Sequence, residues 1–485
     1  MPGNIDSIKI RMYNTGSVGD CFLLLFQKKG VTTFTMMIDC GGIKTSSALV
    51  TPAVQDILNT TNGKIDLLLG THQHEDHLSG FNLARPVFDQ LKVDEVWMSW
   101  VEDATDPLAK LVKQKYGKKL KELHAAMQKW AATAAGSVAA GPGEAMSARR
   151  KYINQQIRQS LELLEFEKGG DHAKGLAAGS RTNDDAMKYL KKKGKKMMYR
   201  QPGEIITMPG AEGIKFYVLG PPRDSDLKFL KIEMNEDEMY HLAVTSADEP
   251  AEAPAPSLAD IETMLVDGQS PFSKEYLLSG KELSKFKKNY NSHNFKWRQI
   301  EDDWKESAND MALALTRLIN NTSLAIALEF EQSGAVILLP ADAQSGNWMS
   351  WHKPEVVNAF KKKGGKETNE LLNNTVFYKV GHHSSHNGTA SKSGLEMMNS
   401  KDLVAFIPLI KDKVPAAWNP SGFPAAKLYP KIIEKAKGRV VRTDKGLITD
   451  GGADAQRARL SGTDKKAFSN AFKSGANYYE YTVNG

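Results

Sequence analysis

Short apolar runs occur toward both ends of the 485-residue chain, and a more polar stretch of sequence lies between them. Some alternate apolar and polar residues, while others are continuous and bounded by Gly, Pro or Asp. Such runs are typical of β-strands, and the continuous ones indicate strands buried on both faces. The expected strands lie at residues 7–12, 21–26, 33–39, 66–71, 214–222, 323–330, 335–340, 375–381, 403–408 and 439–444. The pattern predicts an α/β frame whose strands come from distant parts of the chain.

Two inserts interrupt this frame. Residues 101–200 are rich in Ala, Lys, Leu and Gln at helical spacing, which predicts a helical insert. Residues 223–308 are acidic and contain SADEPAEAPAPS, which is typical of a linker. The predicted organisation is a core in two halves with its return strands, the two inserts and a C-terminal extension. The boundaries are 1–100, 101–200, 201–222, 223–308, 309–450 and 451–485.

Composition narrows the class of protein. Hydrophobic residues make up 41% of the chain and charged residues 25%, which is ordinary for a soluble globular protein. The sequence does not open with a secretion signal, and no apolar run reaches the roughly 18 residues of a membrane span. Only two cysteines occur, Cys21 and Cys40, so a framework of several disulfides is excluded. We therefore expect a cytoplasmic protein without a membrane partner.

The stretch HQHEDH, residues 72–77, directly follows an apolar run. Residues i and i+2 of an extended segment face the same way, so His72 and His74 can bind one ion together. Asp76 and His77 lie just beyond, where the chain turns toward a helix, and can reach a second ion. Imidazole and carboxylate groups are ligands that Zn²⁺ accepts, and a catalytic zinc keeps one position open for water. The stretch therefore indicates a metal site.

Two further strand ends carry residues that can complete such a site. Asp342 follows one apolar run, and His382, His383 and His386 follow another. Six of the 11 histidines thereby lie just past predicted strands. Asp342 alone would be read as a turn or helix-cap residue, but the order of strand and then ligand occurs three times. The repetition predicts that these side chains meet in one dinuclear metal centre.

Several motifs resemble a known family. H-x-H-x-D-H is the signature of the metallo-β-lactamase fold, and other motifs resemble its ComEC-like branch, the metallo-hydrolases of DNA-uptake proteins and their free-standing relatives. These motifs are NTGSVGDCFLLLF with Asp20, MMIDCGG with Asp39, NNTSLAIAL before PADA, KVGHHSS, and the segment from NPSGF to RVVRTDKG. They span about half of the chain and leave both inserts outside. The resemblance implies a four-layer αβ/βα sandwich with its metals at the strand ends.

The resemblance also assigns roles to single residues. It implies two divalent ions, with zinc preferred and manganese as the alternative. Their ligands would be His72, His74, Asp76, His77, Asp342 and His383. Asp76 and His382 would take part in catalysis, and Ser384, His386 and Asn419 would contact the substrate. Asp39 would orient a ligating histidine without touching the metal.

Two positions depart from the family pattern. Gly220 stands where many relatives carry a third metal histidine, so we expect one metal to lack one protein ligand and to bind more weakly. That metal would be held by His72, His74 and Asp342. Asn419 stands where the branch often has histidine, and an amide can hydrogen-bond a substrate but cannot move a proton.

Charge bears on the substrate class. The net charge is +7, but residues 101–200 hold 21 basic against 11 acidic residues, whereas 221–308 hold 11 against 18. Five lysines crowd into residues 191–196, and residues 149–151 and 361–363 are also basic. Such clusters bind phosphate backbones, although each run alone is also typical of a solvated face.

We therefore predict a metal-dependent phosphodiesterase that acts on nucleic acid through the lysine-rich insert, most simply a nuclease. A hydrolase of the same fold acting on a lactone, a phosphoester or a β-lactam-like molecule is the first alternative, because fold alone does not choose the substrate. A nucleic-acid or protein-binding module with a weakened site is the second.

Overall fold

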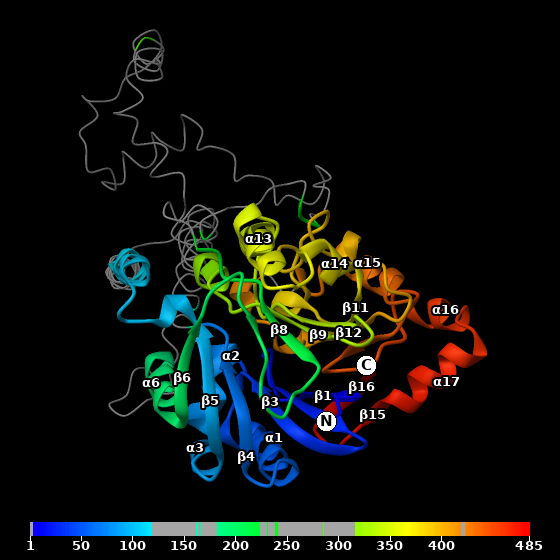
Figure 1. Ribbon diagram of the computed structural model, residues 1–485, viewed down its shortest axis with the longest axis horizontal. Helices are drawn as coiled ribbons and strands as arrows, with labels where there is room; N and C mark the ends of the chain where they lie inside the picture. Colours follow the sequence, from blue (N-terminus) through cyan, green and yellow to red (C-terminus); the bar gives the residue numbers. More distant parts are fainter. Residues whose placement is uncertain are drawn as a thin grey trace, which may run out of the picture. The chain divides into compact units, whose positions relative to one another are not determined.

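Two mixed β-sheets form the frame of the described chain, and each contains eight strands (Figure 1). The first sheet has the order β15-β16-β1-β2-β3-β4-β5-β6, in which β3 to β6 run parallel. Its strands are β1 (Ser7–Tyr13), β2 (Phe22–Lys28), β3 (Val31–Ile38), β4 (Lys64–Gly70), β5 (Lys92–Ser99), β6 (Gly194–Arg200), β15 (Phe472–Ser474) and β16 (Tyr478–Asn484). The first sheet thus joins strands from both ends of the chain.

The second sheet has the order β14-β13-β12-β11-β10-β9-β8-β7, in which β10 to β13 run parallel. Its strands are β7 (Ile205–Ile206), β8 (Ile214–Val218), β9 (Ile326–Phe330), β10 (Val336–Leu339), β11 (Thr375–Lys379), β12 (Val404–Ile407), β13 (Val440–Arg442) and β14 (Gly446–Leu447). Each of the ten predicted strand segments overlaps an observed strand. The prediction of an α/β protein is confirmed as two mixed sheets with helices.

The computed structural model describes residues 3–118, 162, 166, 182–223, 230, 238–240, 285, 316–418 and 422–485. Apart from Lys285, these residues belong to one unit made of Met1–His241 and Met311–Gly485. Most of both predicted inserts therefore lies outside the described residues. The histidines of the inserts, His124, His172, His241 and His293, lie outside them as well.

Successive side chains of a strand point to opposite faces of its sheet, and both faces of each sheet are buried in hydrophobic clusters. In β2, Leu24 belongs to a hydrophobic cluster that contains residues of both sheets, such as Phe216 and Ile337. Its neighbours Leu23 and Leu25 belong to a second cluster, which includes residues of the helices that follow β3 and β4. Burial on both faces explains why β2 reads as a continuous apolar run.

The helices divide between the two sheets. Helices α1 (Ser47–Thr60), α2 (Glu75–Leu83), α3 (Arg85–Phe88) and α6 (Asn183–Lys193) contribute to the cluster of the first sheet. Helices α12 (Ser345–Ser350), α13 (Pro354–Lys362), α14 (Thr368–Asn373), α15 (Leu428–Lys435) and α16 (Ala453–Ala458) contribute to that of the second. Figure 1 shows α1 and α3 beside the first sheet and α13 to α15 beside the second.

Two segments differ from their predicted form. Residues 194–200, expected within a helical insert, form strand β6 at the edge of the first sheet, parallel to β5. Lysines are common on edge strands because they discourage pairing with another chain, and this role explains part of the lysine run. The segment 451–485 contains α16, α17 (Gly462–Ala471), β15 and β16, and β16 pairs with β1 over seven residues.

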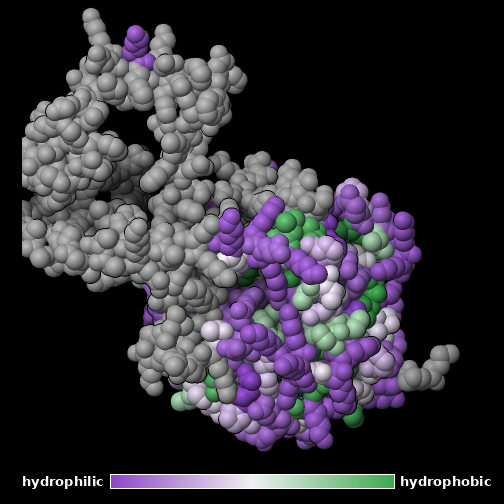
Figure 2. All heavy atoms as spheres, turned by 90° about the vertical axis from the view of Figure 1, so that its left-hand side faces the viewer, coloured by the Kyte–Doolittle hydropathy of each residue, from purple (hydrophilic) through white to green (hydrophobic). Residues whose placement is uncertain are grey.

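The described part of the face in Figure 2 is mostly hydrophilic, with hydrophobic residues in small scattered patches. Within the described ranges, no helix has both the length and the apolar composition that a transmembrane span requires.

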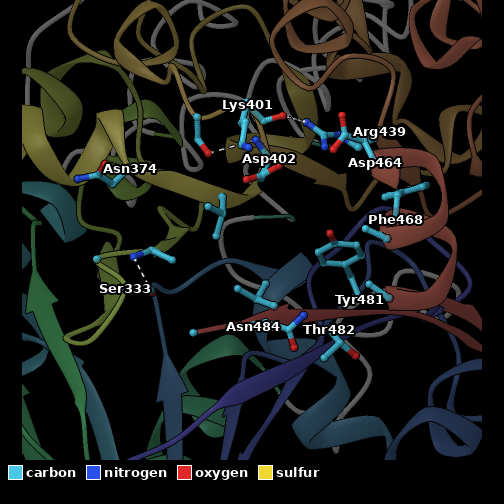
Figure 3. Close-up of a pocket in the computed structure, with 18 of the residues that line it drawn as sticks. Ser333, Asn374, Lys401, Asp402, Arg439, Asp464, Phe468, Tyr481, Thr482 and Asn484 are labelled. Carbon is cyan, nitrogen blue, oxygen red and sulfur yellow. Dashed lines mark hydrogen bonds between the residues drawn. The ribbon is translucent and has the colours of Figure 1, made fainter. Parts of the chain in front are cut away.

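A cavity of about 670 Å³ (Figure 3) is lined by Lys401, Arg439, Asp464 and Tyr481 among others. Because no predicted metal ligand lines it, this cavity is separate from the candidate site.

Candidate metal centre

The carboxyl ends of parallel strands in both sheets lead into the predicted ligands. Strand β4 leads into α2, whose N-cap is His74 and whose first turn contains Asp76 and His77. Asp342 follows β10, and His383 lies in the short 3₁₀ segment after β11. Loops at the carboxyl ends of parallel strands are where α/β proteins place their sites. The two sheets thus bring residues about 300 positions apart to one place, as Asp76 and His383 illustrate.

The turn after β3 brings helix α2 close to the strand ends. A Cβ atom at Gly41 would lie 2.3 Å from the carbonyl carbon of Asp76, so only glycine permits this approach. The Cys40 N–H donates to the His77 carbonyl at 2.9 Å, and the Gly80 N–H donates to the Cys40 carbonyl at 2.8 Å. The sequence CGG therefore holds the first turn of α2 in position.

Four buried side chains converge at this point. Asp20, His77, Asp342 and His383 each offer one possible ligand atom, and these atoms lie within 4.8 Å of one another. All four residues are at most 1% exposed. Asp76 adjoins them, since its Oδ2 lies 2.7 Å from His383 Nε2 and 3.6 Å from His77 Nε2. This group can hold a metal ion.

The spacing of the ligand atoms fits a cation. The Asp342 Oδ2 atom lies 3.2 Å from His77 Nε2 and 3.4 Å from His383 Nε2. Four ligands at about 2.0–2.2 Å around a tetrahedral zinc lie about 3.3–3.6 Å from one another. Asp20 Oδ1, Asp76 Oδ1, His77 Nε2 and Asp342 Oδ2 are buried without a hydrogen-bond partner. Buried polar atoms without partners are costly, so their convergence fits a bound ion.

Other groups fix the orientation of both histidines. The His77 Nδ1 atom donates to Asp39 Oδ2 at 2.7 Å, because an ionised carboxylate can only accept. Asp39 also accepts from the Thr71 N–H at 2.9 Å and from Thr71 Oγ1 at 2.6 Å. His383 Nδ1 donates to the Pro408 carbonyl at 2.7 Å. In both rings the Nε2 atom is left facing the cluster, which is how proteins orient metal-binding histidines.

A buried ammonium group lies beside the carboxylates. Lys379 Nζ is 2.5 Å from Asp20 Oδ2 and 3.2 Å from Asp342 Oδ1, and it donates to the Ala341 carbonyl at 2.8 Å. In the sequence, Asp20 and Lys379 belong to the motifs NTGSVGDCFLLLF and KVGHHSS, and neither residue was predicted to be part of the site. The signal for Asp20 was its place directly before a buried strand.

The charges of the cluster shift its pKa values strongly. Burial alone would raise the pKa of Asp342, but His77, His383 and Lys379 lower it well below the usual value. Burial opposes protonation of His77, yet Asp342 and Asp76 raise its pKa well above the usual value. The same balance, with Asp342 as the main partner, raises the pKa of His383 to about 10. The surrounding carboxylates therefore favour a positive charge at this point, on the imidazoles or on a bound cation.

His72 and His74 form a separate pair next to this group. His72 Nε2 lies 3.0 Å from His74 Nδ1, and the His72 ring centroid lies 4.1 Å from that of His77. Burial lowers the pKa of His72 well below its usual value, and the neighbouring His77 adds to the effect, so the ring is neutral. A neutral imidazole is the form that binds metal. The assignment of this pair as ligands stays a prediction.

His382 sits at the centre of a hydrogen-bond network outside the cluster. Its Nδ1 lies 2.6 Å from Ser385 Oγ and 3.3 Å from Gln344 Nε2, and its Nε2 lies 3.3 Å from Asn320 Nδ2. Burial lowers the pKa of His382 to about 4. His382 is therefore neutral at physiological pH. A neutral imidazole is better suited to hydrogen-bond a substrate than to donate a proton to it.

The backbone around His382 is unusual. His382, His383 and Ser384 have φ angles of 44°, 50° and 66°, a run of left-handed conformations that non-glycine residues rarely adopt. Such strain persists only where the surroundings enforce it, and it is common at functional sites. It turns consecutive side chains in different directions, so His383 reaches the cluster while His382 lines a neighbouring cavity.

The predicted substrate contacts fall in three different settings. Ser384 is buried, and its Oγ has no hydrogen-bond partner. His386 lines the same cavity as His382. Asn419 lies outside the described residues, although Trp418 and Gly422 on either side of the gap line that cavity as well. The structure therefore brings His382 and His386 together and leaves these roles as predictions.

Another residue occupies the space beside Gly220, the position where many relatives carry a metal-binding histidine. A Cβ atom at Gly220 would lie 1.9 Å from Asn347 Oδ1. Asn347 is fully buried and donates to the carbonyls of Asn321 at 3.1 Å and Ser323 at 3.0 Å. It also accepts from Trp351 Nε1 at 2.8 Å. The amide thus occupies the space that a histidine at position 220 would need.

Four of the eight lysines in the two described runs form ion pairs. Lys191 pairs with Glu102 at 3.3 Å, Lys195 with Asp94 at 2.6 Å, and Lys196 with Glu95 at 3.6 Å. Lys361 pairs with Glu367. These groups offer less net positive charge to a phosphate backbone than the sequence suggests, and residues 149–151 lie outside the described residues.

Comparison with known proteins does not assign a family. A scan against protein-family models and searches of curated proteins and of solved structures found no match to this chain. The case for function therefore rests on the geometry of the site.

Proposed function

We propose that this protein is a metal-dependent hydrolase of the metallo-β-lactamase fold with a dinuclear centre. The observation that carries the proposal is the buried convergence of Asp20, His77, Asp342 and His383, which includes ligand atoms without other partners. The hydrophobic cluster shared by the two sheets, with helices on their other faces, supports the four-layer αβ/βα arrangement.

In this proposal Asp76, His77, His383 and Asp342 would hold one ion, with Asp20 beside them, and His72 and His74 would share Asp342 to hold the other. When bound, two divalent ions, zinc by preference or manganese, supply an activated water and polarise a substrate oxygen. The short distance between His72 Nε2 and His74 Nδ1 supports joint binding, since two ligands of one zinc lie about 3.3 Å apart.

The remaining residues prepare the centre. Asp39 keeps the proton of His77 on Nδ1, so that Nε2 can bind metal. Lys379 offsets the charge of Asp20 and Asp342, which otherwise would repel each other. His382, neutral and held by Ser385, would hydrogen-bond the substrate at the edge of the centre.

A phosphodiester is the proposed substrate, because paired metal ions suit in-line displacement at phosphorus. The resemblance to the ComEC-like branch supports a nuclease, and the paired lysines weaken the argument from charge alone. A small-molecule hydrolase is the second candidate, since the cavity beside His382 has a volume of only about 180 Å³.

Metal analysis followed by cleavage assays tests the proposal. Purified protein should contain divalent metal and cleave labelled single- or double-stranded DNA or RNA in Mn²⁺ or Zn²⁺. Asp342→Ala should lose both properties, whereas Asp402→Ala, an exposed site outside the cluster, should keep both. Hydrolysis of lactones without cleavage of any phosphodiester would select the small-molecule candidate. Absence of metal and of all turnover would reject both hydrolase candidates and favour a nucleic-acid or protein-binding module with a weakened site.

A further inference from the structure

A small cavity lined by His382 adjoins the metal centre, to which the next residue, His383, belongs. It has a volume of about 180 Å³, below the roughly 300–1,000 Å³ of pockets for drug-sized ligands, so it admits one ring system. Its lining includes Arg317, Gln344, Asn387, Trp418 and Phe423. The cavity therefore combines flat apolar surfaces with amide and guanidinium groups, and we call it the aromatic cavity.

Stacked rings form one wall of the aromatic cavity. The Trp418 and Phe423 rings stack with centroids 6.0 Å apart and planes inclined by 29°. Trp418 also lies nearly parallel to the ring of His383, at 6.4 Å and 20°. Phe166 packs edge-on against Trp418 at 5.0 Å and contacts His74 at 4.6 Å. Trp418 thus links the cavity wall directly to the rings of the metal centre.

The polar groups of the aromatic cavity suit a heterocycle. Gln344 and Asn387 both lie 3.3 Å from His382 Nδ1, so their amides are held at the boundary between cavity and centre. Amide side chains hydrogen-bond the edges of bases, and aromatic side chains stack on their faces. A guanidinium such as that of Arg317 pairs with phosphate oxygens.

We propose that the aromatic cavity binds one unstacked base of a single-stranded nucleic acid, next to the phosphodiester that is cleaved. This inference rests on the proposed function and adds the substrate class. A paired base cannot enter so small a space unless it leaves the duplex, which costs a few kcal/mol. Single strands should therefore be preferred over duplexes.

Two substrates that differ only in the base test this directly. The p-nitrophenyl esters of thymidine 5′-phosphate and of its abasic tetrahydrofuran analogue have the same scissile bond and the same leaving group. We expect kcat/KM to be about 10–100-fold higher for the thymidine ester, the size of a base–aromatic stack. Trp418→Ala should bring this ratio close to one, whereas Trp418→Phe should keep most of it.

The matched control is Phe472→Ala. Phe472 is a half-buried stacked ring that lines neither cavity, with centroids 6.1 Å from Tyr479, and its loss should leave the ratio unchanged. A second readout does not need metal. In EDTA, fluorescence anisotropy should show tighter binding of single-stranded oligo-dT than of a fully abasic strand or a duplex, and Trp418→Ala should remove this preference.

The outcomes separate this inference from the proposed function. Equal cleavage of both esters together with equal binding of both strands would overturn the base site and leave the phosphodiesterase intact. Equal binding of duplex and single strand would also overturn it. Base-dependent binding without any cleavage would support the base site and reject the phosphodiesterase. Trp418-dependent hydrolysis of an aryl lactone, without a base effect on either ester, would assign the aromatic cavity to a small molecule and overturn the inference.

Discussion

Replacing Asp39 by Asn should weaken metal binding without changing any proposed metal ligand. Asp39 has a φ angle of 51°, a left-handed conformation that asparagine adopts readily, so the backbone should not change. The carboxylate accepts three hydrogen bonds, two from Thr71 and one from His77. An amide has only one acceptor oxygen.

The position of that oxygen decides the effect. If it stays on the Thr71 backbone N–H, which cannot rotate, the amide NH₂ faces His77 Nδ1 and forces that nitrogen to accept. The ring then keeps its proton on Nε2, the nitrogen that faces the cluster and would have to lose its proton to bind metal. Loss of such a supporting contact typically costs about 10–100-fold in metal affinity, or about 1.4–2.8 kcal/mol.

The chain offers a close control for this experiment. Asp66 likewise accepts from the N–H and the Oγ1 of one threonine, Thr35, at 2.8 and 2.9 Å, but both bonds reach its Oδ2 and no histidine takes part. Asp39→Asn should lower the free energy of unfolding in EDTA by about 1–3 kcal/mol, and Asp66→Asn should lower it less, because one amide oxygen can keep both threonine hydrogen bonds. Only Asp39→Asn should weaken Zn²⁺ binding in competition with a chromophoric chelator. An affinity within twofold of the wild type, or an equal loss in Asp66→Asn, would refute the reasoning.

Three further predictions concern the same centre. Asp342→Ala should lower turnover at least about 1,000-fold and reduce the metal content while circular dichroism stays unchanged; full metal content would exclude Asp342 as a shared ligand. Gly220→His should lower the melting temperature without strengthening metal binding, because Asn347 fills the space. The double variant Gly220→His with Asn347→Ala has room for the imidazole ring and should bind metal at least about tenfold more tightly than Gly220→His alone. Equal metal affinities of these two variants in chelator titrations would contradict this. Metal binding near pH 7 should release protons, because the raised pKa values of His77 and His383 keep both rings protonated in the metal-free protein. Affinity should therefore rise with pH, and calorimetry in buffers of different ionisation enthalpy would disprove this by showing no proton release.

The metal ligands could be predicted from the sequence where a ligand directly follows the carboxyl end of a parallel strand. The carboxyl ends of parallel strands meet at one edge, so the residues after β4, β10 and β11 could be expected together from the order of apolar runs alone. His77, Asp342 and His383 do converge. Asp20 escaped this reasoning because it stands at the start of β2. That strand is antiparallel to β3, so its start lies at the same edge as the end of β3.

Contacts between distant segments could not be read from residue spacing. The lysines at 191–196 are a basic run in the sequence, but Lys195 and Lys196 meet Asp94 and Glu95 only because β5 and β6 lie side by side. The alternation of inward and outward side chains in β6 could not be recognised in the sequence, because lysines occupy consecutive positions at its start. The filling of the space at Gly220 depends on Asn347, which is 127 positions further along the chain and reaches it only in the folded protein.

The pairing of β1 with β16 has a consequence for biosynthesis. Arg11 and Glu480 form an ion pair across these strands although they stand 469 positions apart. At about 5–20 residues per second, a ribosome needs roughly 20–90 s to make the chain between them. During this interval the edge of β1 that will receive β16 has no partner strand, and such edges are prone to pair with other chains. A chaperone that shields nascent strands should therefore raise the yield of this protein, and premature termination before β16 should favour aggregation.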